Sequence, residues 1–238
     1  MGRAYEVRKV SIQKTGAVKA KIYSMFAKEI YQAAKDGGIE ADSNFTLKHL
    51  IDKAREEQVP SDIIKRAIEK VNSGANESYV SAKYEIFGPG GSTVIVDCLT
   101  DNLNRSISSI RTALNKTNSK MGVSGSASFM YDNLSVISFK NMSEEATINA
   151  LIEANVDIDD IETDQDSVIV YGKPTALYEI KEALIKAMPN ITFETNEITM
   201  FPKEKIVLQG EDLFYFNKLI TMLDDIEDVK NVYHNVII

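Results

Sequence analysis

The sequence predicts an α+β protein that has an N-terminal three-helix domain and two ferredoxin-like α+β domains, one inserted in the other. The chain has 238 residues, enough for roughly two or three small hydrophobic cores. Its hydrophobic period changes from helical to strand-like near residue 79, and the elements expected beyond residue 133 follow the order βαββαβ of a split βαβ fold. The expected parts are a basic flexible arm over 1–18, a three-helix domain over 19–75, an α+β domain over 79–132 and 204–238, and an inserted ferredoxin-like α+β domain over 133–203.

Three short amphipathic helices are expected in the first third of the chain. Each has apolar residues three and four positions apart, as Met25 and Phe26 are from Ile22, so that one helix face is apolar. Glycines that accept left-handed backbone end a helix, and small polar side chains cap the next one. The expected boundary residues are Lys19 at the first start, Gly37 and Gly38 at its end, Ser43 or Asn44 as the second cap, and Ser61 after Pro60 as the third cap.

Two strands joined by a tight turn are expected next, over 81–87 and 93–99. The sequence Gly-Pro-Gly-Gly lies between them, and it favours a turn because Pro presets φ and Gly accepts positive φ. A phosphate cradle is the alternative, but the loop lacks the Gly-Lys-Ser/Thr ending of a P-loop and joins two strands, so a hairpin is favoured. A helix over 103–117, capped by Asp101 or Asn102, and a strand over 126–131 follow.

The remaining chain is expected to form the inserted domain and then to complete the first sheet. The inserted elements are a strand over 134–139, a helix over 143–154 capped by Ser143, strands over 157–162 and 167–171, a helix over 174–187 and a strand over 191–199. A helix over 211–224 and a strand over 229–237 supply the αβ half that the segment 79–132 lacks.

Charge is distributed unevenly along the chain. The net charge is −8, yet residues 1–75 contain 14 Lys and Arg against 10 Asp and Glu, a balance of +4. Residues 76–238 contain the other 13 bases and 25 acids, a balance of −12. Within the first 28 residues, seven bases accompany a single acid, Glu6. A polyanion is therefore attracted to the N-terminal end and repelled by the rest.

The N-terminal bases are the candidate nucleic-acid ligands, because each lysine or arginine that neutralises a phosphate releases counterions. Lys21 and Lys28 are seven residues apart and share a face if both are helical. A solvated arm, or an arm that binds a protein, is the alternative interpretation of the same charge. The candidates are Arg3, Arg8, Lys9, Lys14, Lys19, Lys21 and Lys28.

Secondary candidates lie on two later helices. The compact turn between the second and third helices could belong to a helix-turn-helix, with Lys65 and Arg66 on the following helix. That helix has no Asn or Gln before Asn72, so a packing helix is favoured over a base-reading one. Arg105, where a strand leads into a helix, is a further candidate. A cluster of acids, either a solvated turn or a surface for a basic partner, comprises Asp224, Asp225, Glu227 and Asp228.

The composition argues against metal, catalytic and membrane functions. The segment Asp157–Asp166 lacks the mid-loop Gly and closing Glu of a calcium loop, and neither His49 nor His234 has a neighbouring ligand at metal spacing. No nucleophile elbow, His-Glu-x-x-His or Cys-x-x-Cys motif occurs, and the lone Cys98 lies in an apolar strand. No apolar run approaches ~20 residues and no secretory signal is recognised, so we expect a cytoplasmic protein with no catalytic residues, metals or cofactors.

Several long motifs agree in order and spacing with one known family. They are Gly-Arg-Ala-Tyr at 2–5, Ala-Lys-Asp-Gly-Gly at 34–38, Ile-Asp-Lys-Ala-Arg at 51–55, Val-Pro-Ser-Asp-Ile-Ile-Lys-Arg-Ala-Ile at 59–68, Phe-Gly-Pro-Gly-Gly at 87–91, Val-Ile-Val-Asp-Cys-Leu-Thr-Asp-Asn-Leu-Asn-Arg at 94–105, Gly-Glu-Asp at 210–212 and the stretch 222–235. With these motifs the chain resembles the YebC/PmpR family of bacterial regulators along its full length, and in particular the YeeN-like branch.

The resemblance implies a non-enzymatic, DNA-binding transcriptional regulator with three domains and no cofactor. Relatives are also implicated in translation, so a factor that binds the ribosome through rRNA is the alternative, and an enzyme with an unrecognised site is a third hypothesis. The commoner branch opens with a Gly-His-Ser-Lys-Trp-Ala arm, whereas here Tyr5 is the only aromatic in the corresponding stretch. We expect a monomer whose partner is DNA or, in the alternative, rRNA.

Overall fold

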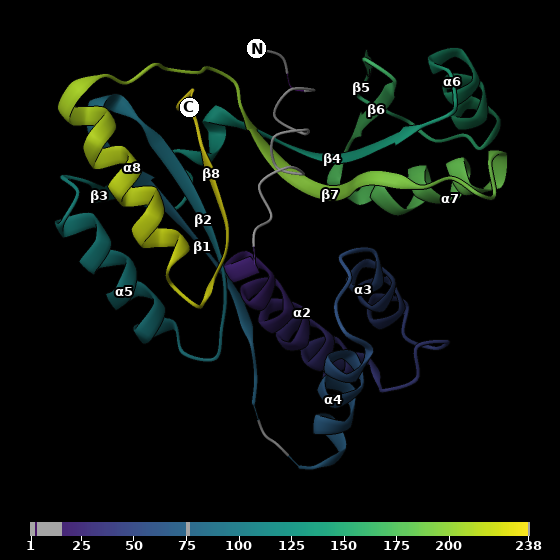
Figure 1. The fold of residues 1–238 in the computed structure, drawn as a ribbon, viewed down its shortest axis with the longest axis horizontal. Coiled ribbons are helices and arrows are strands. Elements are labelled where there is room, and N and C mark those ends of the chain that lie inside the picture. Colours follow the sequence, from purple (N-terminus) through teal and green to yellow (C-terminus); the bar gives the residue numbers. More distant parts are fainter. Residues whose placement is uncertain (1–2, 4–15, 75–76, 238) are drawn as a thin grey trace. The chain divides into compact units, whose positions relative to one another are not determined.

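The structure is a computed structural model that describes Arg3, residues 16–74 and residues 77–237 (Figure 1). Its contacts separate two compact units. One, called the inserted unit below, contains Phe129–Glu204, and the other contains the described residues of Thr15–Ser128 and Lys205–Ile238. Both contain helices packed on antiparallel strands, which confirms the predicted α+β class.

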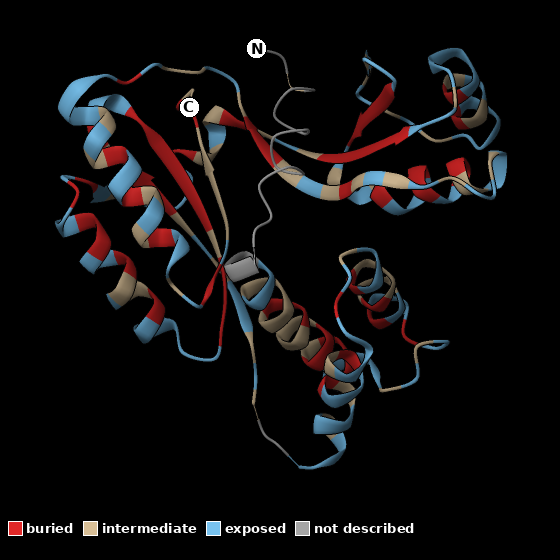
Figure 2. Cartoon of the chain, in the orientation of Figure 1, coloured by how far each residue is buried: buried red, intermediate tan, exposed pale blue. Residues whose placement is uncertain are grey.

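Three helices share one apolar core in the N-terminal part of the chain. α2 (Gly16–Gly37) packs against α3 (Phe45–Glu56) and α4 (Ser61–Asn72). Apolar residues at three- and four-residue spacing give each helix one buried stripe, as Figure 2 shows. The buried residues of this core include Phe26, Ile30, Ala34, Leu47, Ile51, Ala54, Ile64 and Ala67.

Glycine and asparagine make the connection between α2 and α3. Gly38 has a φ of 92°, a left-handed conformation that ends α2 at low cost because glycine has no Cβ. Asn44 then caps α3, where its side-chain oxygen accepts the N–H of Leu47 at 3.0 Å. The same side chain donates from Nδ2 to the carbonyl of Ala33 at 2.8 Å, so the cap also ties the two helices together.

Two helix starts differ from the prediction. α2 begins at Gly16 rather than near Lys19, so the last three residues of the predicted arm belong to the helix. The expected Ser61 cap is wrong, because Ser61 is the first helical residue of α4 and Pro60 occupies the cap position without a side-chain hydrogen bond. The fixed φ of Pro60 suits the entry to a helix, so this start needs no polar cap.

The first sheet is antiparallel and has the strand order β3-β1-β2-β8. β1 (Val80–Phe87) and β2 (Thr93–Thr100) form the predicted hairpin, whose turn includes Gly90 at φ 61° and Gly91 at φ 80°. The other elements of this layer are α5 (Leu103–Asn115), β3 (Lys120–Met121), α8 (Gly210–Asp224) and β8 (Val229–His234).

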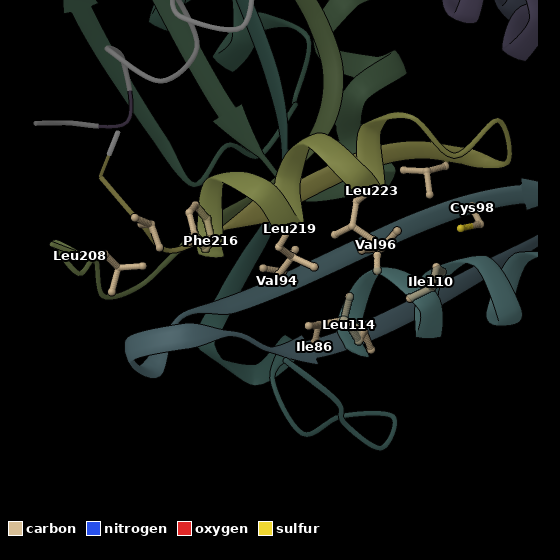
Figure 3. Packing of buried hydrophobic residues seen from close by; sticks show 13 residues of the cluster. Ile86, Val94, Val96, Cys98, Ile110, Leu114, Leu208, Phe216, Leu219 and Leu223 are labelled. Carbon is tan, nitrogen blue, oxygen red and sulfur yellow. The ribbon is translucent and has the colours of Figure 1, made fainter. Parts of the chain in front are cut away.

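α5 and α8 pack on the same face of this sheet (Figure 3). Alternate side chains of β2 point toward them, since successive side chains of a strand face opposite sides. Full burial of one such aliphatic side chain contributes about 1.5–3 kcal/mol, so this shared core fixes α5 and α8 firmly. The residues that meet there include Val94, Val96, Cys98, Ile110, Leu114, Phe216, Leu219 and Leu223.

The predicted strand over 126–131 is wrong, and Glu85 explains the difference. The carboxylate of this residue, which is 5% exposed, accepts the backbone N–H groups of Gly125 at 2.7 Å, Ala127 at 2.5 Å and Ser128 at 3.0 Å. Backbone groups bonded to a side chain cannot join a strand ladder. The chain therefore forms the two-residue β3, a loop and a 3-10 turn before the next strand begins.

The inserted unit has the ferredoxin-like topology that the sequence predicts. Its strand order is β5-β6-β4-β7 with antiparallel neighbours throughout, which matches a split βαβ fold. Ser143 caps the first helix by accepting the N–H of Ala146 at 3.2 Å, as expected. The elements are β4 (Tyr131–Lys140), α6 (Glu144–Glu153), β5 (Asp160–Asp164), β6 (Ser167–Gly172), α7 (Leu177–Ala187) and β7 (Phe193–Pro202).

Candidate nucleic-acid interface

The predicted nucleic-acid ligands differ in their surroundings. Arg3 contacts two acids of the inserted unit: its guanidinium is 3.3 Å from the carboxylate of Asp132 and 3.9 Å from that of Asp160. It also lies over the ring of Tyr171, 5.7 Å from the ring centroid. The charge of Arg3 is therefore compensated within the protein. The candidates that lie outside the described residues are Arg8, Lys9 and Lys14.

Lys19 and Lys21 lie on α2 with different exposure. Lys19 is exposed to solvent. The ammonium group of Lys21 donates a hydrogen bond to the backbone carbonyl of Asp224 at 2.7 Å. Burial lowers the pKa of Lys21, although the carboxylate of Asp224 opposes this effect. Lys21 is thus occupied by a contact inside the protein, whereas Lys19 is accessible to a ligand.

Lys28 contacts the acidic turn that follows α8. Its ammonium group is 3.3 Å from the carboxylate of Glu227 and 3.6 Å from that of Asp228, and its side chain is only 11% exposed. Lys21 and Lys28 share a helix face, as their spacing predicts, and this face meets the acidic turn of the same unit. The acids of this turn therefore have a basic partner within the chain itself.

Arg105 is bound by acids at the start of α5. It donates to the Asp228 carboxylate from Nε at 3.0 Å and from Nη2 at 2.7 Å, and Nη2 is also 2.7 Å from Asp101. The hydroxyl of Ser106 donates to Asp228 at 2.9 Å. Burial alone would raise the pKa of Asp228, but the hydrogen bonds from Arg105 and Ser106 hold it below the usual range. Arg105 therefore fastens α5 to the turn before β8.

The cations of α4 are more accessible. Lys65 and Arg66 are both exposed, and Arg66 pairs with Asp62 one turn earlier on the same helix. A surface pair of this kind contributes only about 0.3–0.5 kcal/mol, so Arg66 can exchange Asp62 for another anion at little cost. The buried face of α4, which includes Ile64 and Ala67, packs into the helical core.

Two tyrosines fasten the connection between the helical bundle and β1, a feature that the sequence did not reveal. Tyr31 donates from its hydroxyl to the carbonyl of Glu77 at 3.2 Å, and its ring meets that of Tyr79 edge-on at 5.9 Å. The carboxylate of Glu77 accepts from Tyr79 and from Lys70, each at 2.6 Å. The backbone N–H of Tyr79 donates to Gln32 on α2 at 2.7 Å. The segment 77–79 that leads into β1 is therefore held against α2 and α4.

Other titratable groups show packing roles. Cys98 is 2% exposed, and burial raises the pKa of its thiol to about 12, so it is a poor nucleophile. His234 packs edge-on against Phe216 with ring centroids 5.2 Å apart. Within the described residues, no group of three or more His, Cys, Asp and Glu side chains is arranged to hold a metal ion. In the same part of the chain, every helix is too short or too polar to cross a membrane.

A helical bundle joined to two antiparallel α+β layers defines a class of multidomain α+β proteins. Comparison with known families identifies the class more closely: residues 3–74 match the TACO1/YebC protein N-terminal domain, and residues 79–236 match the TACO1/YebC second and third domain. Together these matches span nearly the whole sequence, and the chain belongs to the TACO1/YebC family.

Individual relatives match along nearly their full length. A probable transcriptional regulatory protein of Pseudoalteromonas atlantica is 45% identical over 238 residues, which is 100% of this chain and 98% of that protein. A protein of Vibrio parahaemolyticus with the same description is 45% identical over 235 residues and 99% of each chain. The crystal structure of a conserved hypothetical protein from Aquifex aeolicus has a TM-score of 0.76 at 30% identity and covers 94% of this chain and 92% of its own.

Proposed function

We propose that this chain is a non-enzymatic transcriptional regulator of the cytoplasm that binds DNA through cations near its N-terminus. The main support is the charge asymmetry, a balance of +4 over residues 1–75 against −12 over residues 76–238. Such a distribution directs a polyanion to one end of the protein. The description of the relatives as probable transcriptional regulatory proteins agrees with this role.

The contacts of the candidate cations suggest that they have two different roles. Lys21 and Lys28 contact the acidic turn, and in this proposal they position α2 rather than bind DNA. Each lysine or arginine that meets a phosphate contributes about 0.9 to the slope of log affinity against log salt concentration. The cations proposed to make these phosphate contacts are Arg8, Lys9, Lys14 and Lys19.

A salt titration of DNA binding tests the assignment. We expect the fourfold variant R8Q/K9Q/K14Q/K19Q to bind every duplex more weakly, because up to four counterion-releasing contacts are removed. Its salt slope should be smaller than that of the wild type by about two to four. Fluorescence anisotropy with a labelled duplex of about 20 base pairs, between roughly 50 and 200 mM salt, measures both quantities.

The matched control removes four exposed lysines from the acidic part of the chain, in the variant K173Q/K186Q/K203Q/K218Q. This variant has the same net charge as the first and should retain the slope of the wild type. Equal slopes for the two variants would show that the N-terminal cations are not the DNA ligands. A structured rRNA fragment forms a second arm, and tighter binding to it than to DNA, lost in the first variant, would favour the ribosome-binding alternative.

A further inference from the structure

A segment without acids lies inside the acidic part of the chain. Residues 76–238 contain 25 Asp and Glu, a density of between four and five in every thirty residues. Residues 102–131 contain none. This segment comprises α5, β3 and the loop that follows. Its basic residues are Arg105, Arg111, Lys116 and Lys120.

α5 displays a polar row on the side away from its core residues. Ile110, Ala113 and Leu114 are buried against the sheet, and Figure 2 shows that α5 also has exposed residues on its other side. Positions separated by four, three and four residues lie in one line along a helix. The exposed residues at these positions are Asn104, Ser108, Arg111 and Asn115.

The charges near this row are favourable for an anionic ligand. The acids at the start of α5, Asp101 and Asp228, both accept hydrogen bonds from Arg105, and Asp228 also lies 3.6 Å from the ammonium group of Lys28. Among the described residues, neither Arg111 nor Lys116 takes part in an ion pair, and both are exposed. The guanidinium of Arg111 therefore lies in the middle of a polar helix face with its donors accessible.

The residue types of the row match the edges of DNA bases. Arginine binds guanine through two hydrogen bonds, asparagine binds adenine in the same way, and serine contacts either base. The exposed side of α4 also contains acids, Asp62 and Glu69, and its one asparagine, Asn72, is the last residue of the helix. A helix fits the major groove of B-form DNA, which is about 12 Å wide, whereas the major groove of A-form RNA is too narrow for side chains to read.

We propose that the exposed face of α5 enters the major groove of duplex DNA and discriminates between sequences. Arg111 and Asn115 contact base edges, and Lys116 binds a flanking phosphate. This role of α5 rests on the proposed function, in which the N-terminal cations supply attraction that is independent of sequence. The two regions thus divide the affinity into an electrostatic part and a base-reading part.

The full-length protein is first used to select duplexes from a randomised library, and the selected duplex is the probe. The ratio of affinities for the selected duplex and for the random pool is then measured for the wild type and for R111A/N115A. We expect this ratio to fall by between about 10- and 100-fold in the double variant, because two base contacts are lost. In the conservative variant R111K the affinity ratio should fall by a smaller factor, while the affinity for the random pool is retained. Lysine keeps the positive charge but lacks the planar guanidinium that makes two parallel hydrogen bonds.

The matched control is N149A/K186A, which removes one exposed asparagine and one exposed cation from the helices of the inserted unit. It should retain the ratio of the wild type. Three results would overturn the role of α5 and leave the proposed function intact. They are an unchanged affinity ratio in R111A/N115A, an equal fall of the ratio in the control, and a wild type that shows no sequence preference. Absence of any salt-dependent DNA binding by the wild type would overturn both. If R111A/N115A fails to fold, the affinity ratio of R111K compared with that of the wild type provides the test.

Discussion

Two buried carboxylates show how single residues organise this protein. Asp228 accepts hydrogen bonds from the side chains of Arg105 and Ser106, whereas Glu85 accepts them from three backbone N–H groups. Burial alone would raise the pKa of each carboxyl, and in each the hydrogen bonds lower it below the usual range. Each group is therefore ionised at neutral pH and stabilises the fold in that form.

Replacing Asp228 with Asn should reduce the free energy of unfolding by about 2–4 kcal/mol at pH 7. The change removes an anion that is 2% exposed and leaves Arg105 and Lys28 without their shared partner. Urea unfolding of the variant and the wild type measures the difference. Asp166→Asn, at an exposed position, is the control and should change stability by less than about 0.5 kcal/mol.

The pH dependence of this difference has a defined sign. The folded-state pKa of Asp228 lies below its ordinary value of 3.8, so the unfolded chain binds a proton first as the pH falls. The contribution of the carboxylate is complete above that ordinary value and is lost as the pH falls through the lower folded-state pKa. Wild type and Asp228→Asn should therefore converge in stability toward acid pH. If the difference in stability between the two proteins stayed constant down to acid pH, the lowered pKa of Asp228 would be contradicted.

At the scale of elements, local pattern predicts helices well and the edges of sheets less well. Apolar spacing locates α5, α6 and α8 to within about two residues, because a helix depends mainly on neighbours along the sequence. The strand expected over 126–131 fails for the opposite reason. Its backbone donors are captured by Glu85, which is about forty residues earlier in the chain. The apolar and hydroxyl residues of the segment 126–131 do not by themselves reveal that a distant carboxylate accepts its backbone N–H groups.

Glu85→Gln should release the loop between β3 and the 3-10 turn. An amide has one acceptor oxygen instead of two, so at least one of the N–H groups of Gly125, Ala127 and Ser128 loses its partner. We expect a loss of about 1–3 kcal/mol in the free energy of unfolding. Hydrogen exchange of these amides should become faster, while Glu153→Gln, an exposed change, leaves it unaltered. Unchanged protection would mean that Glu85 does not hold the loop.

At the scale of the whole molecule, the unit formed by the described residues of Thr15–Ser128 and Lys205–Ile238 is held together partly by charge. Lys28 meets Asp228, and Lys230 of β8 pairs with Glu29 of α2. The cations that make the N-terminal region basic therefore do not all serve a ligand. Net charge predicts attraction of a polyanion, but it does not tell which lysines remain available.

Lys28→Ala should change the stability of the fold, whereas Lys19→Ala should change DNA binding, although both remove one charge from α2. Lys28→Ala should destabilise the fold by about 1–3 kcal/mol and leave the salt slope of DNA binding unchanged, because a nearly buried ion pair is broken. Lys19→Ala should leave stability within about 0.5 kcal/mol and reduce the slope by about one. Thermal unfolding and salt titration of the two variants measure this. A reduced slope in Lys28→Ala would reassign that residue to the DNA interface.

The α+β class, the family, the helices and the concentration of basic residues near the N-terminus can all be predicted from the order of the amino acids, because periodicity, turn residues and composition are local properties. The partners of these charges, in contrast, depend on the fold. Lys21 meets Asp224, which is 203 residues away, and Arg105 meets Asp228, which is 123 residues away. The energy of two charges depends on their distance and on the surrounding solvent, and folding sets both.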